Sequence, residues 1–260
     1  MRIKIVSWNV NSIRARLPLV LEFINSRNPD ILCMQETKVE DPLFPREEFE
    51  KLGYNVAIFG QKRFNGVATL SRLPFKEVQP YIFNQDINHR RTLITKIKDF
   101  TIINIYFPNG QAPDTEAFRY KIDFIYRLKD FLIKHYSNKD NLIILGDFNV
   151  AMEEIDVYDK EEMDGKIGFH PEERKALREL YNFGFVDLFR IFNKEKAFSW
   201  WDYRAGAFWK DIGLRIDYIW ATPPMAEKCV ECFIDKSFRR KKKPSDHAPV
   251  VAVFELEGKL

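Results

Sequence analysis

The sequence predicts an α/β (α+β) protein in which strands and helices pack as layers of a sandwich, and three observations favour this fold class. Strand-like and helix-like segments are mixed without strict β–α–β alternation, and several strands follow one another as hairpins. No repeat, low-complexity tract or linker-like stretch divides the 260 residues. We therefore expect a single domain over residues 1–260, which is long enough to bury a sizeable core.

Apolar periodicity predicts the elements in order. Short apolar or alternating runs predict strands at 3–8, 31–34, 54–59, 66–71, 92–97, 101–107, 142–149, 216–221 and 250–254. Apolar residues at helical spacing predict helices at 17–27, 116–136 and 171–183, and the end of a further helix at Gly53. The strands at 92–97 and 101–107 are joined across Lys98 and Asp99 by a short link, which is typical of a hairpin.

Composition and charge are those of a soluble globular protein, with 45% hydrophobic and 30% charged residues. The net charge of +3 is small, so binding to a polyanion has to come from local clusters of basic residues. The three cysteines are Cys33 and a lone C-x-x-C at 229–232, without the second ligand pair of a zinc site. The small, odd number of cysteines predicts reduced thiols and a cytoplasmic (intracellular) location. We expect no signal peptide, because MRIKIVSWNV has no apolar region followed by a cleavage site, and no transmembrane segment, because no apolar run approaches ~18 residues.

The stretch at 142–149, LIILGDFN, is the most informative single segment. Its uninterrupted aliphatic run ends at a glycine and indicates a strand buried on both faces. Asp147 and Asn149 follow Gly146, and residues i and i+2 of an extended segment point to the same side. The alternative is an Asx-rich turn that only closes a core strand, since Asp and Asn are common turn formers.

Other predicted strands also end in polar residues, namely Asn9, Asn11, Glu36, Tyr106, Asn109, Asp217, Asp246 and His247. A buried carboxylate is costly unless it is paired, and Asp217 is flanked by apolar residues, so we expect it to orient His247. Glu36, Asp246 and Asn9 offer hard oxygen ligands, which suit Mg²⁺ or Mn²⁺ rather than zinc. Each residue alone is more often a cap or a turn, but together they indicate metal-assisted phosphoryl chemistry.

Motifs along almost the whole chain resemble those of one family. They are SWNVNSIRAR at 7–16, PDILCMQETKV at 29–39, NGVATLS at 65–71, NIYFPNG at 104–110, ILGDFNVAMEEIDV at 144–157, GFHPEER at 168–174, GFVDLFR at 184–190, FSWWDYR at 198–204, GLRIDYI at 213–219 and PSDHAPV at 244–250. On these motifs the chain resembles the exonuclease III type of abasic-site (AP) endonuclease, within the endonuclease/exonuclease/phosphatase superfamily. QETK, GDFN and SDHAP mark the superfamily, whereas FSWWDYR and GLRIDY are typical of its DNA-repair branch.

The resemblance implies a four-layered α/β sandwich, two mostly antiparallel sheets flanked by helices, with the active site at one edge. The implied metal ligands, for Mg²⁺ or Mn²⁺, are Glu36, Asn9 and Asp246. The implied catalytic residues are Asp147 at the attacking water, Asn149 at the water or the phosphate, Tyr106 at the phosphate, and His247 at a phosphate oxygen, oriented by Asp217. The implied substrate-binding residues are Asn109 at the phosphate, Trp200, Leu214 and Ile216 around a flipped abasic sugar, and Arg204, with Trp209, in a loop that enters the duplex.

The reaction that the resemblance implies is Mg-dependent hydrolysis of the phosphodiester 5′ to an abasic site in double-stranded DNA, with 3′-5′ exonuclease and 3′-end-cleaning activity. The implied partner is double-stranded DNA with abasic sites or blocked 3′ ends, bound by a monomer away from any membrane. One alternative is a phosphoesterase of the same superfamily that acts on a non-DNA phosphoester, which FSWWDYR and GLRIDY disfavour. Another is an inactive nucleic-acid-binding module, which would not need the catalytic set.

Three segments leave alternatives open. Residues 159–167 are acidic and lack the asparagines that many relatives carry before the GFHPEER motif, so the resemblance implies no phosphate contacts for this loop. The run RRKKK at 239–243 is either a solvated face or a patch that follows the DNA backbone. The alternative for FSWW and LRI is that they belong to the core, Trp201 above all.

Overall fold

The computed structural model describes residues 1–83 and 88–257. Its strands are β1 (Arg2–Asn9), β2 (Ile31–Gln35), β3 (Asn55–Phe59), β4 (Val67–Ser71), β5 (Phe75–Gln79), β6 (Thr92–Ile97), β7 (Phe100–Tyr106), β8 (Leu142–Asp147), β9 (Val186–Asp187), β10 (Trp200–Trp201), β11 (Gly213–Leu214), β12 (Asp217–Ala221), β13 (Cys229–Ile234) and β14 (Val250–Glu255). Its α-helices are α1 (Ile13–Arg27), α2 (Arg46–Glu50), α3 (Glu116–His135), α4 (Lys160–Met163), α5 (Pro171–Tyr181), α6 (Leu188–Phe192) and α7 (Pro223–Ala226). Short 3-10 helices are η1 (Asp41–Leu43), η3 (Glu154–Asp156), η4 (Arg204–Gly206) and η5 (Lys236–Arg240).

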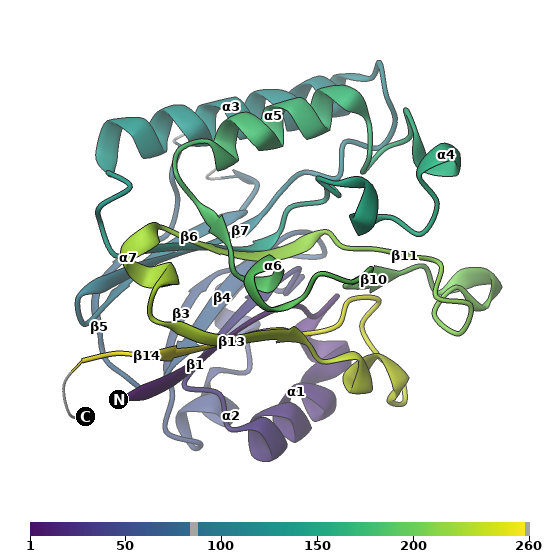
Figure 1. Cartoon of the computed structure of the whole chain (residues 1–260). Helices are drawn as coiled ribbons and strands as arrows, with labels where there is room; N and C mark the ends of the chain where they lie inside the picture. The colour runs from purple at the N-terminus through teal and green to yellow at the C-terminus, as the bar shows by residue number, and fades with distance from the viewer. Residues whose placement is uncertain (84–87, 258–260) are drawn as a thin grey trace.

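Two six-stranded sheets are stacked between layers of helices (Figure 1). One sheet has the order β13-β14-β1-β2-β4-β3, and α1 and α2 lie on its outer face. The other has the order β5-β6-β7-β8-β12-β9, and α3 and α5 lie on its outer face. The predicted fold class, a four-layered sandwich with two mostly antiparallel sheets, is confirmed. No helix in the described part of the chain has both the length and the apolar character to cross a membrane.

Strand β8 is buried on both faces, as its aliphatic run predicted. Ile143 and Leu145 belong to the central core between the two sheets, whereas Leu142 and Ile144 pack beneath α3 and α5. Each face of the strand therefore has its own apolar partner layer, which leaves the strand little freedom to move. The residue that ends it, Asp147, is held in a fixed place.

Each sheet contains one parallel pair, β1 with β2 and β7 with β8. Parallel strands end side by side, so the residues that follow them meet at one edge of the sheet. Asn9 pairs with Gln35 at the end of the first pair, and Tyr106 pairs with Asp147 at the end of the second. Antiparallel β12 begins at the same edge, because Asp217 pairs with Asp147.

Some predicted boundaries were wrong for local reasons. Helix α1 begins at Ile13 rather than at residue 17, because Ser12 Oγ accepts a hydrogen bond from the backbone N–H of Ala15 and caps an earlier first turn. Strand β8 ends at Asp147 rather than at Asn149, whose φ of 52° lies in the left-handed region. Strands β5 and β13 were missed because they lie at sheet edges and lack a buried apolar pattern: four of the five residues of β5 are exposed, and one of the six residues of β13 is buried.

Candidate active site

Residues from both sheets meet at the edge where the parallel pairs end. Asn9 is the last residue of β1, and Glu36 follows β2 with a φ of 50°. Tyr106, Asp147 and Asp217 lie side by side at the ends of β7, β8 and β12. Asn9 connects the two sheets at this edge. Its Nδ2 donates hydrogen bonds to Glu36 Oε1 at 2.8 Å and to Asp147 Oδ2 at 2.9 Å.

Gly146 lets β7 and β8 approach closely just before this row. Its φ is 141°, and a Cβ built at this position would lie 1.8 Å from the carbonyl oxygen of Ile105. Any other residue would push the two strands apart. The glycine at the end of the apolar run therefore has a steric role, since it brings Tyr106 and Asp147 into register.

Asp147 is almost fully buried, and its carboxylate is bonded within the site. Oδ1 accepts a hydrogen bond of 3.0 Å from the backbone N–H of Asn149. This is the Asx turn that the sequence left open as an alternative. The other oxygen, Oδ2, faces Asn9 and lies 3.5 Å from His247 Nε2. The turn and the polar cluster therefore coexist, and the turn fixes the carboxylate that the cluster uses.

His247 is held from behind by Asp217. Its Nδ1 lies 2.8 Å from Asp217 Oδ2, which also accepts a hydrogen bond of 2.7 Å from Ser199 Oγ. The backbone N–H of His247 donates to Ser245 Oγ. With Nδ1 engaged in this way, Nε2 is the nitrogen directed at Asp147.

Asp246 connects the polar cluster to an apolar wall. Its Oδ2 accepts a hydrogen bond of 2.9 Å from Trp200 Nε1, and its Oδ1 accepts one of 3.2 Å from Asn11 Nδ2. Trp200 pairs with Leu214 on the short β10–β11 ribbon. The carboxylate therefore fixes the position of the indole ring beside the polar cluster.

These side chains border a cavity of about 220 Å³. Its lining includes the predicted residues Glu36, Tyr106, Asn109, Asn149, Trp200, Leu214, Ile216, Asp246 and His247. Asn9, Asp147 and Asp217 lie behind them, buried but bonded to the lining residues. Arg204 is not in this lining; its guanidinium is exposed and bonded to Asp202.

Several ionisable side chains lie close together in the site and shift one another's pKa. Burial raises the pKa of Asp147 to about 7, helped by the carboxylates of Asp217 and Glu36 and opposed by His247. Burial alone would lower the pKa of His247, but the carboxylates of Asp217, Asp147 and Asp246 raise it overall. Burial, with Glu36 and Asp147 nearby, raises the pKa of the Tyr106 hydroxyl, which therefore stays protonated. The site favours an imidazolium and a neutral phenol around its carboxylates.

The donor set fits a divalent cation. Ligand atoms of Glu36, Asp147 and His247 all lie within 4.8 Å of one another. Carboxylate oxygens are hard ligands, and crowded carboxylates gain most from a nearby cation. Among protein groups near Glu36, Lys38 Nζ supplies a positive charge at 3.0 Å from Oε2. Asp246, which the sequence placed in the ligand set with Asn9, has both oxygens bonded to Asn11 and Trp200.

A buried ion pair that the sequence patterns did not predict lies directly behind two residues of the cavity lining, Asn109 and Asn149. Lys121 of α3 forms a short hydrogen bond with Glu173 of α5, and both side chains are fully buried. Lys121 Nζ also donates to the backbone carbonyls of Asn149 at 2.7 Å and Asn109 at 3.1 Å. The signal was present in the sequence, because a lysine on the apolar face of a helix needs a buried partner.

The basic run at 239–243 is split rather than continuous. Arg239 is only 8% exposed, packs over the rings of Tyr203 and Phe208, and donates to the carbonyl of Trp201. The prediction that the whole run is either solvated or bound to phosphate was therefore wrong for Arg239. The following lysines are exposed beside α1.

Some residues of the FSWW and LRI segments belong to the core and others line the cavity. Trp201 is fully buried in a small core with Phe208, as the core alternative for FSWW predicted, whereas Trp200 lines the cavity. Trp209 is 76% exposed. Leu214 and Ile216 are both buried and both part of the cavity wall. The LRI segment therefore belongs to the core and borders the cavity at the same time.

A two-sheet sandwich with carboxylates, amides, a tyrosine and an oriented histidine at its edge defines a phosphoester hydrolase. The sequence matches the Endonuclease/Exonuclease/phosphatase family over residues 6–247. The chain belongs to this family of metal-dependent hydrolases.

Relatives match the chain from end to end. Exodeoxyribonuclease III of Haemophilus influenzae is 37% identical over 97% of this chain and 100% of its own length. The structure of an AP endonuclease from Archaeoglobus fulgidus matches 98% of this chain and 100% of its own, with a TM-score of 0.94 and 40% identity. A 3′ phosphatase from Neisseria bound to a product DNA hairpin matches the same shares, with a TM-score of 0.92 and 35% identity. The family resemblance inferred from the motifs is confirmed.

Proposed function

We propose that this hydrolase is a DNA-repair phosphodiesterase that cleaves double-stranded DNA 5′ to an abasic site and also trims or cleans 3′ ends. One observation carries the proposal: the polar cluster around His247 shares a single small cavity with the apolar surfaces of Trp200, Leu214 and Ile216. A phosphate suits the first part and a sugar without a base suits the second. An abasic nucleotide also leaves the helix at lowest cost, because no base has to be unstacked.

The residues of the chain then have distinct tasks. His247, oriented by Asp217 and favoured in its charged form, donates from Nε2 to a phosphoryl oxygen. The neutral Tyr106 hydroxyl and the Asn109 amide contact the same phosphate group. Asn149 also borders the cavity and helps to hold the water or the phosphate.

Asp147 is the proposed proton acceptor for the attacking water. Its raised pKa lies near neutral pH, where a general base is most effective. The water oxygen bonds to phosphorus, the bond from phosphorus to the 3′-oxygen breaks, and the products are a 3′-hydroxyl and a 5′-deoxyribose phosphate. Glu36, Asn9 and Asp246 are the proposed ligands of Mg²⁺ or Mn²⁺, since each oxygen of Asp246 accepts one hydrogen bond and keeps a second lone pair for a cation. Asp147 and His247, whose ligand atoms lie close to those of Glu36, keep their tasks toward the water and the phosphate. When bound, the cation offsets negative charge on the phosphoryl oxygens.

The test is a duplex that carries a single tetrahydrofuran abasic analogue, incubated with the protein in Mg²⁺ and, separately, in EDTA. We expect a nick 5′ to the analogue in Mg²⁺ and none in EDTA. Gel filtration with light scattering tests the accompanying proposal that the enzyme acts as a monomer. Absence of a metal-dependent nick would refute the proposed function.

A further inference from the structure

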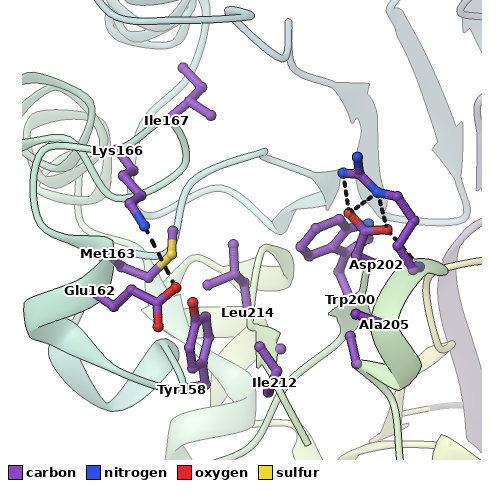
Figure 2. A pocket seen from close by; sticks show the side chains of 13 residues that line it. Tyr158, Glu162, Met163, Lys166, Ile167, Trp200, Asp202, Ala205, Ile212 and Leu214 are labelled. Carbon is purple, nitrogen blue, oxygen red and sulfur yellow. Dashed lines mark hydrogen bonds and ion pairs between the residues drawn. The ribbon is translucent and has the colours of Figure 1, made fainter. Parts of the chain in front are cut away.

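The polar side of the catalytic cavity and its apolar wall are held in different ways. Trp200 and Leu214 of the wall also border a second cavity, of about 650 Å³, which residues of α4 and of the loop before β11 line as well (Figure 2). Glu36 and Tyr106 of the polar side instead follow or end strands of the two sheets. Their positions therefore depend on contacts between the sheets.

The layer between the two sheets changes from apolar to polar just behind this side of the cavity. Residues that belong to the apolar core between the sheets are Ile5 on β1, Cys33 on β2 and Ile102 on β7. Two residues further along each strand, and therefore on the same face, are Ser7, Gln35 and Asn104. All three are fully buried. We call these three residues the polar bridge, because they connect the sheets.

Asn104 crosses from one sheet to the other. It lies on β7, and its Nδ2 donates hydrogen bonds to two backbone carbonyls of the other sheet, that of Met34 on β2 at 3.2 Å and that of Ala68 on β4 at 3.0 Å. Its Oδ1 accepts a hydrogen bond of 2.9 Å from Gln35 Nε2, which also donates to Ser7 Oγ at 3.2 Å. A single side chain is thus bonded to both β2 and β4 of the opposite sheet.

The polar bridge is next to the catalytic residues along the chain. Gln35 directly precedes Glu36, and Asn104 lies two residues before Tyr106 on the same face of β7. Tyr106 is paired with Asp147 on the neighbouring strand. The bond between the two amides therefore connects the strand end before Glu36 with the paired strand ends at Tyr106 and Asp147.

Hydrogen bonds fix this connection more narrowly than apolar packing would. A hydrogen bond needs its donor and acceptor about 2.7–3.2 Å apart and aligned, whereas apolar contacts are non-directional. The net stability that the polar bridge adds is modest, because its bonds replace bonds to water and Gln35 Oε1 has no hydrogen-bond partner among the described residues. The larger effect of the polar bridge is on the offset of one sheet against the other.

We propose that Gln35 and Asn104 are positioning residues, which hold Glu36 at its distance from Asp147 by fixing the offset between the sheets. The inference rests on the proposed function, because it uses the proposed metal ligand and the proposed proton acceptor. Ligand atoms of Glu36, Asp147 and His247 lie within 4.8 Å of one another. Catalytic groups have to be held within roughly 0.5 Å of the productive geometry, so a small slip of the sheets weakens both cation binding and turnover.

The first measurement is a titration with Mn²⁺ alone, without DNA, followed by the electron paramagnetic resonance signal of the free ion. Asn104→Leu keeps the size of the side chain but removes its hydrogen bonds to the other sheet. We expect this variant to raise the Kd for Mn²⁺ about 10–100-fold, the scale seen when groups that orient metal ligands are removed.

The matched control is Thr95→Val on β6. Thr95 is fully buried, alternates with Leu93 and Ile97, which both pack between the sheets, and its hydroxyl has no hydrogen-bond partner in the described ranges. The variant therefore removes a polar group from the same layer without removing a connection between the sheets. It should leave Mn²⁺ binding and turnover at the wild-type values.

Kinetics on the tetrahydrofuran duplex in Mg²⁺ separate positioning from substrate binding. Asn104→Leu should lower kcat about 10–100-fold. It should leave the Kd for the same duplex in EDTA unchanged, because the polar bridge is buried and cannot touch DNA.

A double variant separates positioning from stability. Asn104→Leu/Gln35→Met also removes the amide that the single variant leaves unpaired, so it should unfold at a higher urea concentration than Asn104→Leu. Its Mn²⁺ affinity and its kcat should stay low, because the bond between the sheets is still absent. The double variant also tests the proposal where Asn104→Leu does not fold.

The outcomes separate this proposal from the proposed function. A wild-type protein that does not nick the duplex in Mg²⁺ counts against the proposed function, while the Mn²⁺ titration still measures the effect of the polar bridge. Wild-type Mn²⁺ affinity and kcat in Asn104→Leu would overturn the positioning role. A double variant that regains both together with its stability would overturn it as well, since the loss would then come from an unpaired buried amide.

Discussion

Asp147 is the residue on which the proposed chemistry depends most directly, because its carboxylate accepts the proton of the attacking water. We expect Asp147→Asn to reduce the single-turnover rate on an abasic duplex by about 10²–10⁴-fold, because the amide accepts no proton from water. Binding to the same duplex in EDTA should stay close to that of the wild type, since the side chain is buried and only 1% exposed. Asp123→Asn, on the exposed face of α3, is the control. Turnover near the wild-type rate would remove Asp147 from the mechanism.

Asp156 supports the site from a distance. It is fully buried and accepts hydrogen bonds from Arg215 at 2.7 Å and Arg190 at 2.5 Å, while Arg215 also bonds to Asp187. Arg215 stands between Leu214 and Ile216, so this network fixes the apolar wall of the cavity. Breaking a buried ion pair by removing one charge costs about 3–5 kcal/mol.

We therefore expect Asp156→Asn to lower the free energy of unfolding by about 3–5 kcal/mol at pH 7. Burial alone would raise the pKa of Asp156, but Arg215 and Arg190 lower it overall, below the ordinary value of 3.8. A carboxylate with a lowered folded-state pKa stabilises the protein above the unfolded-state pKa and loses this effect as pH falls through the folded value. The gap between wild type and Asp156→Asn in urea denaturation should thus narrow below about pH 4.

The control for this titration is Glu154→Gln, a charge removed from the same 3-10 helix at an exposed surface pair with Lys160. It should change stability by less than about 1 kcal/mol. A gap for Asp156→Asn that stays constant down to pH 3 would show that the carboxylate charge does not stabilise the fold.

At the scale of elements, the close approach of β7 and β8 depends on Gly146. In Gly146→Ala the new Cβ would meet the backbone of Ile105, and backbone cannot move aside as a flexible side chain can. We expect a loss of about 3 kcal/mol or more in the free energy of unfolding. Gly165→Ala is the matched control, since its φ is also positive but no atom lies within 4 Å of the added Cβ. Equal losses in urea denaturation would contradict the steric argument.

Helices α3 and α5 are joined to the site by the pair of Lys121 and Glu173. Lys121→Met should cost about 3–5 kcal/mol, because Glu173 stays buried without its partner. The double variant Lys121→Met/Glu173→Gln should recover part of this stability, as no buried charge remains. Its activity should stay at least about tenfold low, because the carbonyls of Asn109 and Asn149 lose their common donor.

A matched control lies on the same two helices. Lys129 pairs with Glu179 at 2.9 Å, and it also links α3 to α5, but at the surface. Lys129→Met should change stability by less than about 1 kcal/mol and leave activity unchanged. Recovery of full activity in the double variant would reduce Lys121 and Glu173 to a purely structural pair.

Strong elements could be predicted from the sequence and edge elements could not. The apolar run at 142–149 predicted β8 because both faces of the strand are buried, and amphipathic spacing predicted α3. Strand β5 gives no such signal, because four of its five residues are exposed and its pairing with β6 supplies the order. The short β10–β11 ribbon is likewise fixed by tertiary contacts, such as the hydrogen bond from Trp200 to Asp246.

At the scale of the whole molecule, the candidate site could be predicted as a set of residues but not as a geometry. Asn9, Glu36, Asp147 and His247 could be predicted because polar residues end several strands at once, although each of them alone is more often a cap or a turn. Their distances depend on how the two sheets stack, which no local pattern encodes. The proximity of Glu36 to Asp147 follows from that stacking, whereas Arg239 is buried because it packs over the rings of Tyr203 and Phe208.

The distribution of positive charge over the molecule gives the final prediction. With Arg239 buried, the part of the basic run that can contact phosphates is the exposed Arg240 and the exposed lysines at 241–243, and these lysines lie beside α1 close to the sequence position of Asp246. Each phosphate contact releases counterions and steepens the dependence of log Kd on log salt by about 0.9. Lys242→Gln with Lys243→Gln should therefore flatten the slope for duplex binding in EDTA by up to about 2. A double Lys→Gln change at 134 and 139, exposed positions at and beyond the far end of α3, is the control and should leave the slope unchanged. Equal slopes for both double variants would place the lysines outside the DNA interface.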